Sequence, residues 1–276
     1  MYEKADEIQN IDPLELLFEK KIMYIASFVV NLRLLMSEKV FRFKKFELSH
    51  ANSSMRVGTD AVLLGAWFGM PSGYLRDGRV LDVGCGCGIL AMMAAQRLPH
   101  CHVLGIDIDS QSVQEATQNA QRSAFADRVR FTEKDVRTLC NEDGTGRFSI
   151  ILCNPPYYTE DTLPPDGRRS FARNTAHLSF GELIRAITRL LEPAGTFAVV
   201  LPMQARESFL NETSSEGLHI HRECRIQTVP GKSPKRVLLE FGFEQHDMVD
   251  ITTLVLQDKD GRRSAEYAEL CKAFYL

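Results

Sequence analysis

Short apolar runs alternate with segments of helical periodicity from residue 79 onward. Apolar residues recur every three to four positions in the helical segments, whereas the strand-like runs are brief and nearly continuous. This pattern predicts strands at 79–83, 102–106, 129–132, 148–153 and 195–201, and helices at 89–98, 110–122 and 180–191. Strands that alternate with helices are typical of a doubly wound α/β fold with a mostly parallel sheet.

Three local signals refine this prediction. Ser179 and Glu182 have the spacing of a capping box, which places the start of the last helix. The run 195–201 is apolar throughout, as expected for a central strand that is buried on both faces. Beyond it, residues 222–229 and 237–244 read as two strands joined by a Pro- and Gly-rich turn, so we expect a C-terminal antiparallel hairpin.

The first 35 residues fall outside this alternation. Residues 22–36 begin with an apolar run, but Asn31 and Arg33 interrupt it, and it is shorter than the roughly 20 residues that span a membrane. Residues 1–19 are acidic rather than basic, unlike a secretion signal. We predict an N-terminal extension at 1–35 and one catalytic domain at 36–276. The extension is either an additional amphipathic helix or a product of start-codon choice, since Met36 would open a natural N-terminus.

Composition narrows the classes of partner. A net charge of −3 argues against a broadly cationic surface, so contact with nucleic acid would need local basic clusters. The seven cysteines are an odd number without disulfide spacing, which favours a reducing, cytoplasmic setting. Cys85 and Cys87 are too close for a zinc knuckle, so no metal is expected. The sequence leaves the oligomeric state open, and a monomer is the simpler expectation.

A glycine-rich turn, Asp82-Val83-Gly84-Cys85-Gly86-Cys87-Gly88, links the first strand of the alternation to its helix. Ligands bind at the carboxyl ends of strands in open α/β sheets, and glycine lets the backbone approach them closely. The spacing differs from the G-x-G-x-x-G of dinucleotide-binding folds. S-adenosylmethionine is the hypothesis considered for the ligand of this turn. The residues of the turn expected to meet it are Asp82, Gly84, Cys85, Gly86 and Gly88, and Asn154, farther along the chain, is expected to meet it as well.

Two carboxylates follow the next strands. Asp107 closes the second strand, where a carboxylate can accept both hydrogen bonds of a ribose diol; Asp109 suits a helix cap better. Asp135 follows the third strand and can accept from an adenine amino group, although a surface-loop carboxylate is the alternative. Ile108 and Val136, their neighbours, are expected beside the same ligand.

Asn154-Pro155-Pro156-Tyr157 follows the fourth strand and suits a planar amino group. The Asn154 side-chain oxygen and the Pro155 carbonyl can accept the two hydrogens of that group, so that its nitrogen lone pair points at a methyl donor. Pro156 stiffens the turn, and Tyr157 can stack on the substrate ring. The alternative is a simple turn after a strand.

The run from Val80 to Cys153 resembles the class I S-adenosylmethionine-dependent methyltransferases, and Asn154-Pro155-Pro156-Tyr157 resembles the branch that methylates amino groups. Phe41–Phe46 and Met55–Trp67, with Val-Gly-Thr-Asp inside the second segment, resemble the bacterial tRNA1(Val) adenine-37 N6-methyltransferases. The resemblance runs from about residue 36 to the end, and Arg56 replaces a more usual lysine. It implies a Rossmann-like fold, S-adenosylmethionine as methyl donor and a tRNA adenine as acceptor.

Basic residues form three local clusters on this slightly acidic chain. Lys44 and Lys45 alternate with phenylalanines at 41, 43 and 46, a pattern that can meet phosphates and stack bases. An edge strand with one apolar face predicts the same alternation. The candidate RNA-binding residues are Lys44, Lys45, Arg168, Arg169, Arg173, Lys235 and Arg236.

Three other functions fit part of the pattern. A protein glutamine N5-methyltransferase shares both motifs, but such enzymes usually carry a helical N-terminal domain, and residues 41–46 do not look helical. A non-catalytic RNA-binding module would not need an intact Asn154 motif. A nicotinamide oxidoreductase would need a different glycine spacing.

Overall fold

The computed structural model describes residues 40–51, 53, 57–70, 77–139, 147–155 and 178–275. The chain divides into two compact units, residues 1–41 and 42–276, and the boundary falls within the short strand β1 (Val40–Arg42). The expected domain boundary at 35/36 lies outside the described residues.

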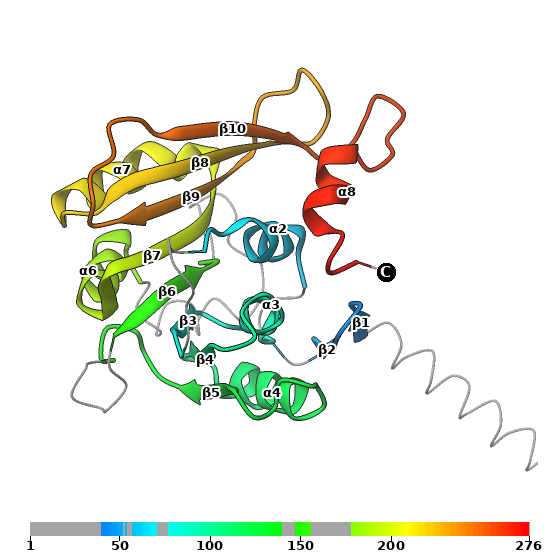
Figure 1. The fold of residues 1–276 in the computed structure, drawn as a ribbon, viewed down its shortest axis with the longest axis vertical. Helices are drawn as coiled ribbons and strands as arrows, with labels where there is room; N and C mark the ends of the chain where they lie inside the picture. Colours follow the sequence, from blue (N-terminus) through cyan, green and yellow to red (C-terminus); the bar gives the residue numbers. More distant parts are fainter. Residues whose placement is uncertain are drawn as a thin grey trace, which may run out of the picture. The chain divides into compact units, whose positions relative to one another are not determined.

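An eight-stranded sheet forms the centre of the second unit (Figure 1). Its strand order is β10 (Asp250–Val255), β8 (His219–Gln227), β9 (Arg236–Gly242), β7 (Leu191–Pro202), β6 (Phe148–Cys153), β3 (Arg79–Val83), β4 (His102–Asp107) and β5 (Val129–Glu133). Within this sheet β9 runs antiparallel to its neighbours β7 and β8, and the other pairs are parallel. The predicted sheet and the C-terminal hairpin are therefore confirmed.

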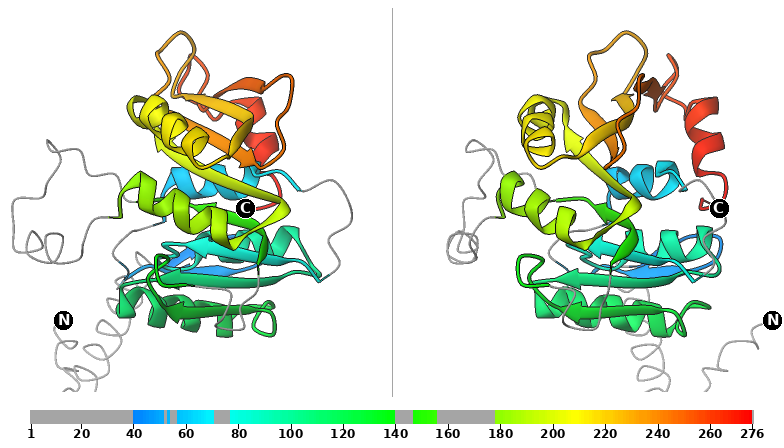
Figure 2. Two further views of the ribbon diagram at one scale, coloured as in Figure 1. Left: turned by 90° about the vertical axis from the view of Figure 1, so that its left-hand side faces the viewer. Right: turned by 60° about the vertical axis from the view of Figure 1, so that its left-hand side comes forward.

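Helices cover both faces of the sheet, as Figures 1 and 2 show. One face carries α2 (Thr59–Trp67), α3 (Ile89–Arg97), α4 (Ser110–Gln121) and α8 (Ala265–Cys271). The other carries α6 (Phe180–Leu190) and α7 (Arg206–Ser215), the latter preceded by a short 3₁₀ turn, η3 (Met203–Ala205). A further short strand, β2 (Glu47–Ser49), belongs to a separate small sheet.

The apolar pattern explains the centre of the sheet. Every residue of β6 is buried, and Leu183, Ile184 and Ile187 of α6 pack in the same cluster. Phe209 of α7 meets the ring of Phe180 edge-on at 5.0 Å between centroids. Burial of such rings contributes most to a core of this kind. The capping box that begins α6 forms as predicted, since Ser179 and Glu182 satisfy each other's backbone N–H groups.

The elements that the sequence pattern did not predict include α7, β10 and α8. Only Phe209 and Thr213 of α7 are buried, so its apolar periodicity is weak. Four of the six residues of β10 are exposed because it is an edge strand of the described sheet. Neither α7 nor β10 carries the contrast between apolar and polar positions on which prediction depends.

The parallel register determines where the functional residues come together. Val83 at the end of β3 is paired with Ile106 of β4 on one side and with Cys153 of β6 on the other. The next residues along the three strands therefore emerge at one edge of the sheet. These residues are Gly84, Asp107 and Asn154.

Candidate functional site

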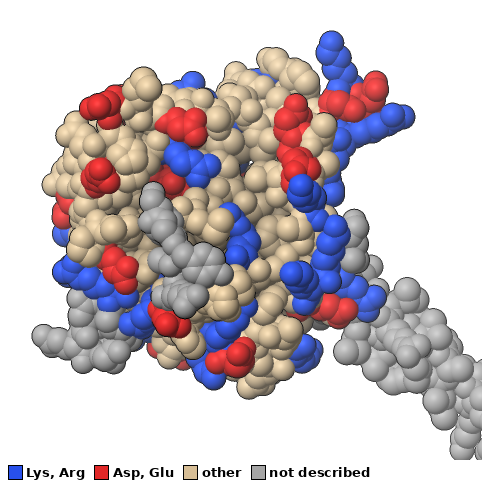
Figure 3. Space-filling model, viewed as in Figure 1, with Lys and Arg blue, Asp and Glu red and all other residues tan. Residues whose placement is uncertain are grey.

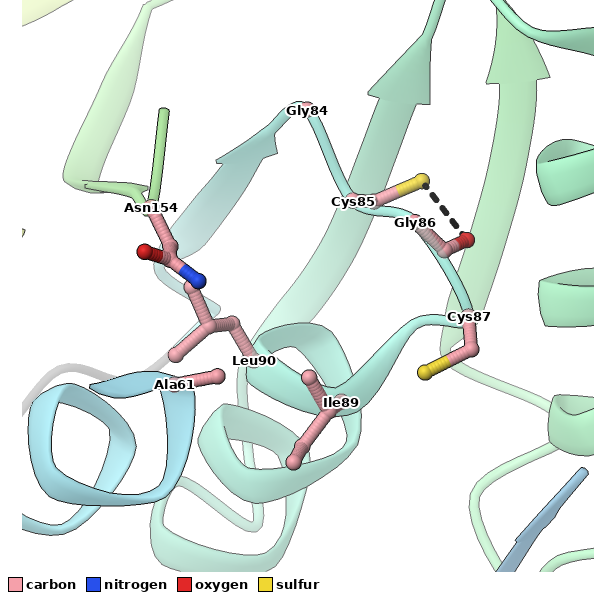
Figure 4. Close-up of a pocket in the computed structure, with 8 residues that line it drawn as sticks. All are labelled: Ala61, Gly84, Cys85, Gly86, Cys87, Ile89, Leu90 and Asn154. Atoms are coloured by element: carbon pink, nitrogen blue, oxygen red, sulfur yellow. Dashed lines mark hydrogen bonds between the residues drawn. The ribbon is translucent and has the colours of Figure 1, made fainter. Parts of the chain in front are cut away.

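A pocket opens at this carboxyl edge of the sheet (Figure 4). It encloses about 320 Å³ of space, including space open to solvent. The glycine turn after β3, the first residues of α3, one residue of α2 and the residue after β6 form its wall (Figure 4). The lining residues are Ala61, Gly84, Cys85, Gly86, Cys87, Ile89, Leu90 and Asn154.

The glycine turn has a left-handed backbone at three positions. Gly84, Gly86 and Gly88 have φ values of 71°, 51° and 88°, a region that side chains strongly disfavour. A Cβ at Gly84 or Gly86 would meet no atom within 4 Å, whereas one at Gly88 would lie 2.7 Å from Cζ of Phe131. Gly84 and Gly86 thus keep the space beside the pocket open, and Gly88 permits packing against β5.

Asp82 lies beneath the turn and is fully buried. Its Oδ2 accepts a hydrogen bond from the backbone N–H of Ala91 at 3.0 Å. Its Oδ1 has no hydrogen-bond partner among the described residues. Burial raises the pKa of this carboxyl to about 7, and the charge of Asp107 adds to the shift. A buried acceptor without a partner is costly to the folded state.

Asp107 ends β4 beside the turn. Its Oδ2 accepts from the N–H of Gly86 at 2.9 Å, and its Oδ1 accepts from the N–H of Asp109 at 3.0 Å. Burial raises the pKa of Asp107. Each carboxylate oxygen keeps a second acceptor position for a ligand hydroxyl. Asp109 caps α4 by accepting from Gln111 and Ser112, as its sequence position predicted.

The other three candidates for the donor's adenine differ in how they are placed. Ile108 is 50% exposed at the same edge of the sheet. The side chain of Val136 is buried in the core cluster, so only its backbone can meet a ligand. Both oxygens of Asp135 accept from Arg137, and hydrogen bonding to Arg137 lowers the pKa of Asp135. A ligand amino group would have to share this carboxylate with Arg137.

Asn154 is partly exposed, and its side chain enters the pocket from the end of β6, opposite the glycine turn (Figure 4). Among the described residues none forms a hydrogen bond with its carboxamide. Pro155 is buried. Pro156 and Tyr157 lie outside the described residues, as do Arg168, Arg169 and Arg173.

Four of the seven basic candidates are described. Lys45 and Lys235 are exposed. Lys44 is exposed too, but its Nζ donates to the carbonyl of Lys272 at 2.6 Å. Arg236 forms an ion pair with Asp60 at 2.8 Å between Nε and Oδ2, so its guanidinium joins β9 to the start of α2.

The expectation that the phenylalanines near Lys44 stack on bases is wrong for two of them. Phe43 and Phe46 are only 4% and 5% exposed, and their rings stack on each other at 4.6 Å. The alternation reflects an apolar face turned inward, which was the alternative reading of the pattern.

Sequence reasoning missed four residues of the pocket lining: Ala61, Cys87, Ile89 and Leu90. Ile89 and Leu90 open the helix after the glycine turn, so their position in the chain carried a usable signal. Ala61 directly follows Val57-Gly58-Thr59-Asp60. These four residues indicated the family resemblance, but they did not indicate that the segment lies beside the pocket.

Two further observations concern the described part of the chain alone. Within it, no three His, Cys, Asp or Glu side chains cluster closely enough to hold a metal ion. No helix in the same ranges is both long and apolar enough to cross a membrane.

Fold and site together define a methyltransferase class. The sequence model of the family described as "Methyltransferase domain" matches residues 75–242. A crystal structure of a predicted O-methyltransferase from Agrobacterium tumefaciens superposes with a TM-score of 0.59 at 20% identity. That likeness covers 78% of this chain and 96% of the other, and it supports the fold.

Relatives with higher sequence identity show which family of methyltransferases the chain belongs to. The tRNA1(Val) (adenine(37)-N6)-methyltransferase of Bacteroides fragilis (strain YCH46) is 39% identical over 241 residues, which are 87% of this chain and 99% of the relative. Those of Vibrio vulnificus (strain YJ016) and Pseudoalteromonas translucida (strain TAC 125) are 36% and 31% identical, covering 86% of this chain and 96% and 98% of the relatives. The chain belongs to the tRNA1(Val) (adenine(37)-N6)-methyltransferase family, which confirms the resemblance seen in its sequence.

We predict that Gly86→Ala weakens binding of S-adenosylmethionine about tenfold or more. The added methyl group would enter the open space beside the pocket, and the positive φ adds strain of about 1 kcal/mol. Gly88→Ala is the matched comparison, because its Cβ would clash with Phe131 and should mainly lower the free energy of unfolding. Calorimetric titration and urea denaturation of both variants test this. Wild-type affinity in a folded Gly86→Ala protein would contradict the prediction.

We also predict a pH-dependent contribution from Asp82. Its folded-state pKa of about 7 lies above the ordinary 3.8, so between these values only the folded state holds the proton. The free energy of unfolding should therefore fall as pH rises from about 4 to about 7, by up to roughly 4 kcal/mol, and then level off. Asp82→Asn lacks this component and can still accept from Ala91.

Urea denaturation of both proteins across this pH range measures the difference between them, which cancels the other titrating groups. A difference that does not change with pH would refute the assignment to Asp82.

Proposed function

We propose that this protein transfers a methyl group from S-adenosylmethionine to N6 of an adenine in a tRNA anticodon loop, adenine 37 of tRNA1(Val). The observation that carries the proposal is the carboxamide of Asn154 in the pocket wall opposite the glycine turn. The relatives' printed names supply the substrate and the position of the methylated adenine.

The glycine-turn side of the pocket fits the methyl donor. Gly84 and Gly86 leave open space, and the carboxylate of Asp82 lies buried beneath the turn with its Oδ1 unpartnered among the described residues. Asp107 would hold the ribose hydroxyls, with Ile108, Asp135 and the backbone of Val136 nearer the donor's adenine. When bound, the donor supplies an electrophilic methyl group on a sulfonium.

The Asn154 side of the pocket would hold the acceptor. The side-chain oxygen of Asn154 and the carbonyl of Pro155 accept the two N6 hydrogens, which turns the nitrogen lone pair toward the methyl group. Pro156 and Tyr157 complete this arrangement by stiffening the turn and stacking on the adenine. Alignment of the reacting atoms can supply about 7–11 kcal/mol of the rate enhancement.

The described pocket wall offers no strong base for the N6 proton. Its titratable members are the thiols of Cys85 and Cys87, and burial raises the pKa of both, to about 12 for Cys87. Both thiols stay protonated at neutral pH. In the proposed mechanism no strong base is required, because the sulfonium becomes neutral as the nitrogen takes up charge; the proton then leaves for water after the methyl group has transferred.

The turn between β8 and β9, residues 228–235, is the first proposed RNA contact. Arg236 at the start of β9 is paired with Pro202 at the end of β7, so the turn lies at the same edge as the pocket. The ion pair of Arg236 with Asp60 fixes the turn beside α2, whose Ala61 lines the pocket. Lys232 and Lys235 are exposed on this turn and can meet phosphates.

Further basic residues extend this proposal. Lysine and arginine side chains gather along the side that carries α8 (Figure 3). Lys44 and Lys45 belong to the same unit, and Arg168, Arg169 and Arg173 follow the catalytic motif in sequence. An adenine in an anticodon loop is already unpaired, so its extrusion into the pocket costs little. A tRNA substrate also implies a cytoplasmic location.

We predict that cells lacking this gene lose N6-methyladenosine from one valine tRNA, and that wild-type protein but not Asn154→Ala restores it. The variant loses one of the two acceptors for the N6 hydrogens, so kcat should fall at least 100-fold while the Kd for S-adenosylmethionine stays within about threefold. Mass spectrometry of digested tRNA measures the modification.

An unchanged tRNA profile, with labelled methyl groups appearing on protein instead, would favour a glutamine N5-methyltransferase. Full methylation by Asn154→Ala would refute the role of the carboxamide.

We further predict that Lys232→Gln and Lys235→Gln each weaken tRNA binding and reduce its salt dependence by about one counterion per lost phosphate contact. Arg147→Gln is the matched control, because Arg147 is exposed at the start of β6, at the opposite edge of the sheet. Binding isotherms at several salt concentrations give the slopes. Equal slopes for all three variants would exclude this turn as a contact.

A further inference from the structure

Two buried polar side chains on α4 have no part in the mechanism above. Glu115 and Asn119 are 3% and 1% exposed. They are four residues apart and therefore share one face of the helix. Polar groups this deeply buried are costly unless each finds partners.

Glu115 binds the chain segment that follows β2. Its Oε1 accepts from the hydroxyl of Ser49 at 2.9 Å and from the N–H of Ala51 at 2.8 Å. Its Oε2 accepts from the N–H of Ser53 at 2.8 Å. One carboxylate thus fixes three points of the segment 49–53, which precedes Val57-Gly58-Thr59-Asp60 and α2.

Asn119 extends this attachment to the pocket. Its Oδ1 accepts from the N–H of Ser49, and its Nδ2 donates to the carbonyl of Ser49, both at 2.9 Å. The same Nδ2 donates to the carbonyl of Cys87 in the glycine turn, also at 2.9 Å. A single carboxamide therefore joins the segment 49–53 to the turn that lines the pocket.

The end of β4, two residues before the cap of α4, holds the turn at a second point. Asp107, just before the capping residue Asp109, accepts from the N–H of Gly86. The turn is therefore held at Gly86 by the residue that leads into α4 and at Cys87 by the third turn of the helix. Loss of either attachment would leave the left-handed glycines free to adopt other conformations.

We propose that Glu115 and Asn119 are positioning residues for the donor pocket: they fasten the segment 49–53 to the glycine turn and so fix the turn in its binding conformation. The inference rests on the proposed use of this pocket for S-adenosylmethionine. Neither side chain lines the pocket. They act through the carbonyl of Cys87 and the backbone of Ser49.

Amide hydrogen exchange of the free protein tests the attachment. In Asn119→Ala, the amides of Ala51 and Ser53 should exchange at least tenfold faster, and the acceleration should extend to Gly86 and Gly88. The Kd for S-adenosylmethionine should rise about tenfold, as expected from loss of the hydrogen bond to the Cys87 carbonyl, the one of the three described above that reaches the turn. Glu115→Gln, which keeps the shape and one acceptor, should show the same pattern more weakly and serves if Asn119→Ala does not fold.

Glu223→Gln is the matched control. Glu223 lies on β8, three strands from β6 in the sheet order, and its carboxylate is fully buried. This carboxylate accepts hydrogen bonds from Arg206 and Arg225. Its loss should lower the unfolding free energy without changing exchange at Gly86 or the Kd for S-adenosylmethionine. If Asn119 had a purely structural role, Asn119→Ala would likewise lower the unfolding free energy without changing exchange at Gly86 or the Kd.

Acceleration confined to 49–53, with wild-type affinity, would overturn the proposal. Because exchange is measured without ligand, it decides the attachment independently of binding. A wild-type protein that fails to bind S-adenosylmethionine would instead refute the proposed function.

Discussion

The site depends on one constraint, the in-register pairing of β3 with β4 and β6. Because Val83 is paired with both Ile106 and Cys153, the residues that follow these strands must emerge side by side. A shift of one residue in either pair would turn the strand over and exchange its buried face for the other. Every residue of β6 is buried, so its register is selected by how its side chains pack on the two faces and not by a contrast between an apolar and a solvated face. The packing that stabilises the sheet therefore also places a glycine turn and a carboxamide in one pocket wall, with the carboxylate of Asp107 at the same edge of the sheet.

The same burial gives the site its electrostatic character. The fold desolvates the carboxylates of both Asp82 and Asp107. The charge of Asp107 also raises the pKa of Asp82. Backbone N–H groups of Ala91 and Gly86 offset part of this cost, but Oδ1 of Asp82 is left without a described partner. The folded protein thus carries a buried acceptor without a described partner, which lowers its stability.

Sequence pattern predicted the central strands, their helices and the glycine turn because these segments have strong apolar contrast and distinctive chemistry. It could not predict β10, whose exposed residues carry no periodic signal, or the partners of charged residues that meet only in the fold. Asp60 and Arg236 are 176 positions apart, and nothing local marks them as a pair. Glu115 and Asn119 read as ordinary polar positions of a helix, although both are buried. The phenylalanines at 43 and 46 show the converse, since alternation identified an apolar face but not whether RNA or the protein core covers it.

The ion pair between Asp60 and Arg236 illustrates how a weak interaction can matter for the substrate side. Their side chains are 28% and 38% exposed, so the pair contributes on the order of 1 kcal/mol or less to stability. The ion pair matters for geometry, because it joins α2 to β9. Helix α2 supplies Ala61 to the pocket, and β9 begins directly after Lys235. The donor side is built on the buried sheet, whereas this side is held by contacts between helix and turn. With the RNA contact proposed above, differences in substrate would arise at the turn 228–235 with little effect on the core of the sheet.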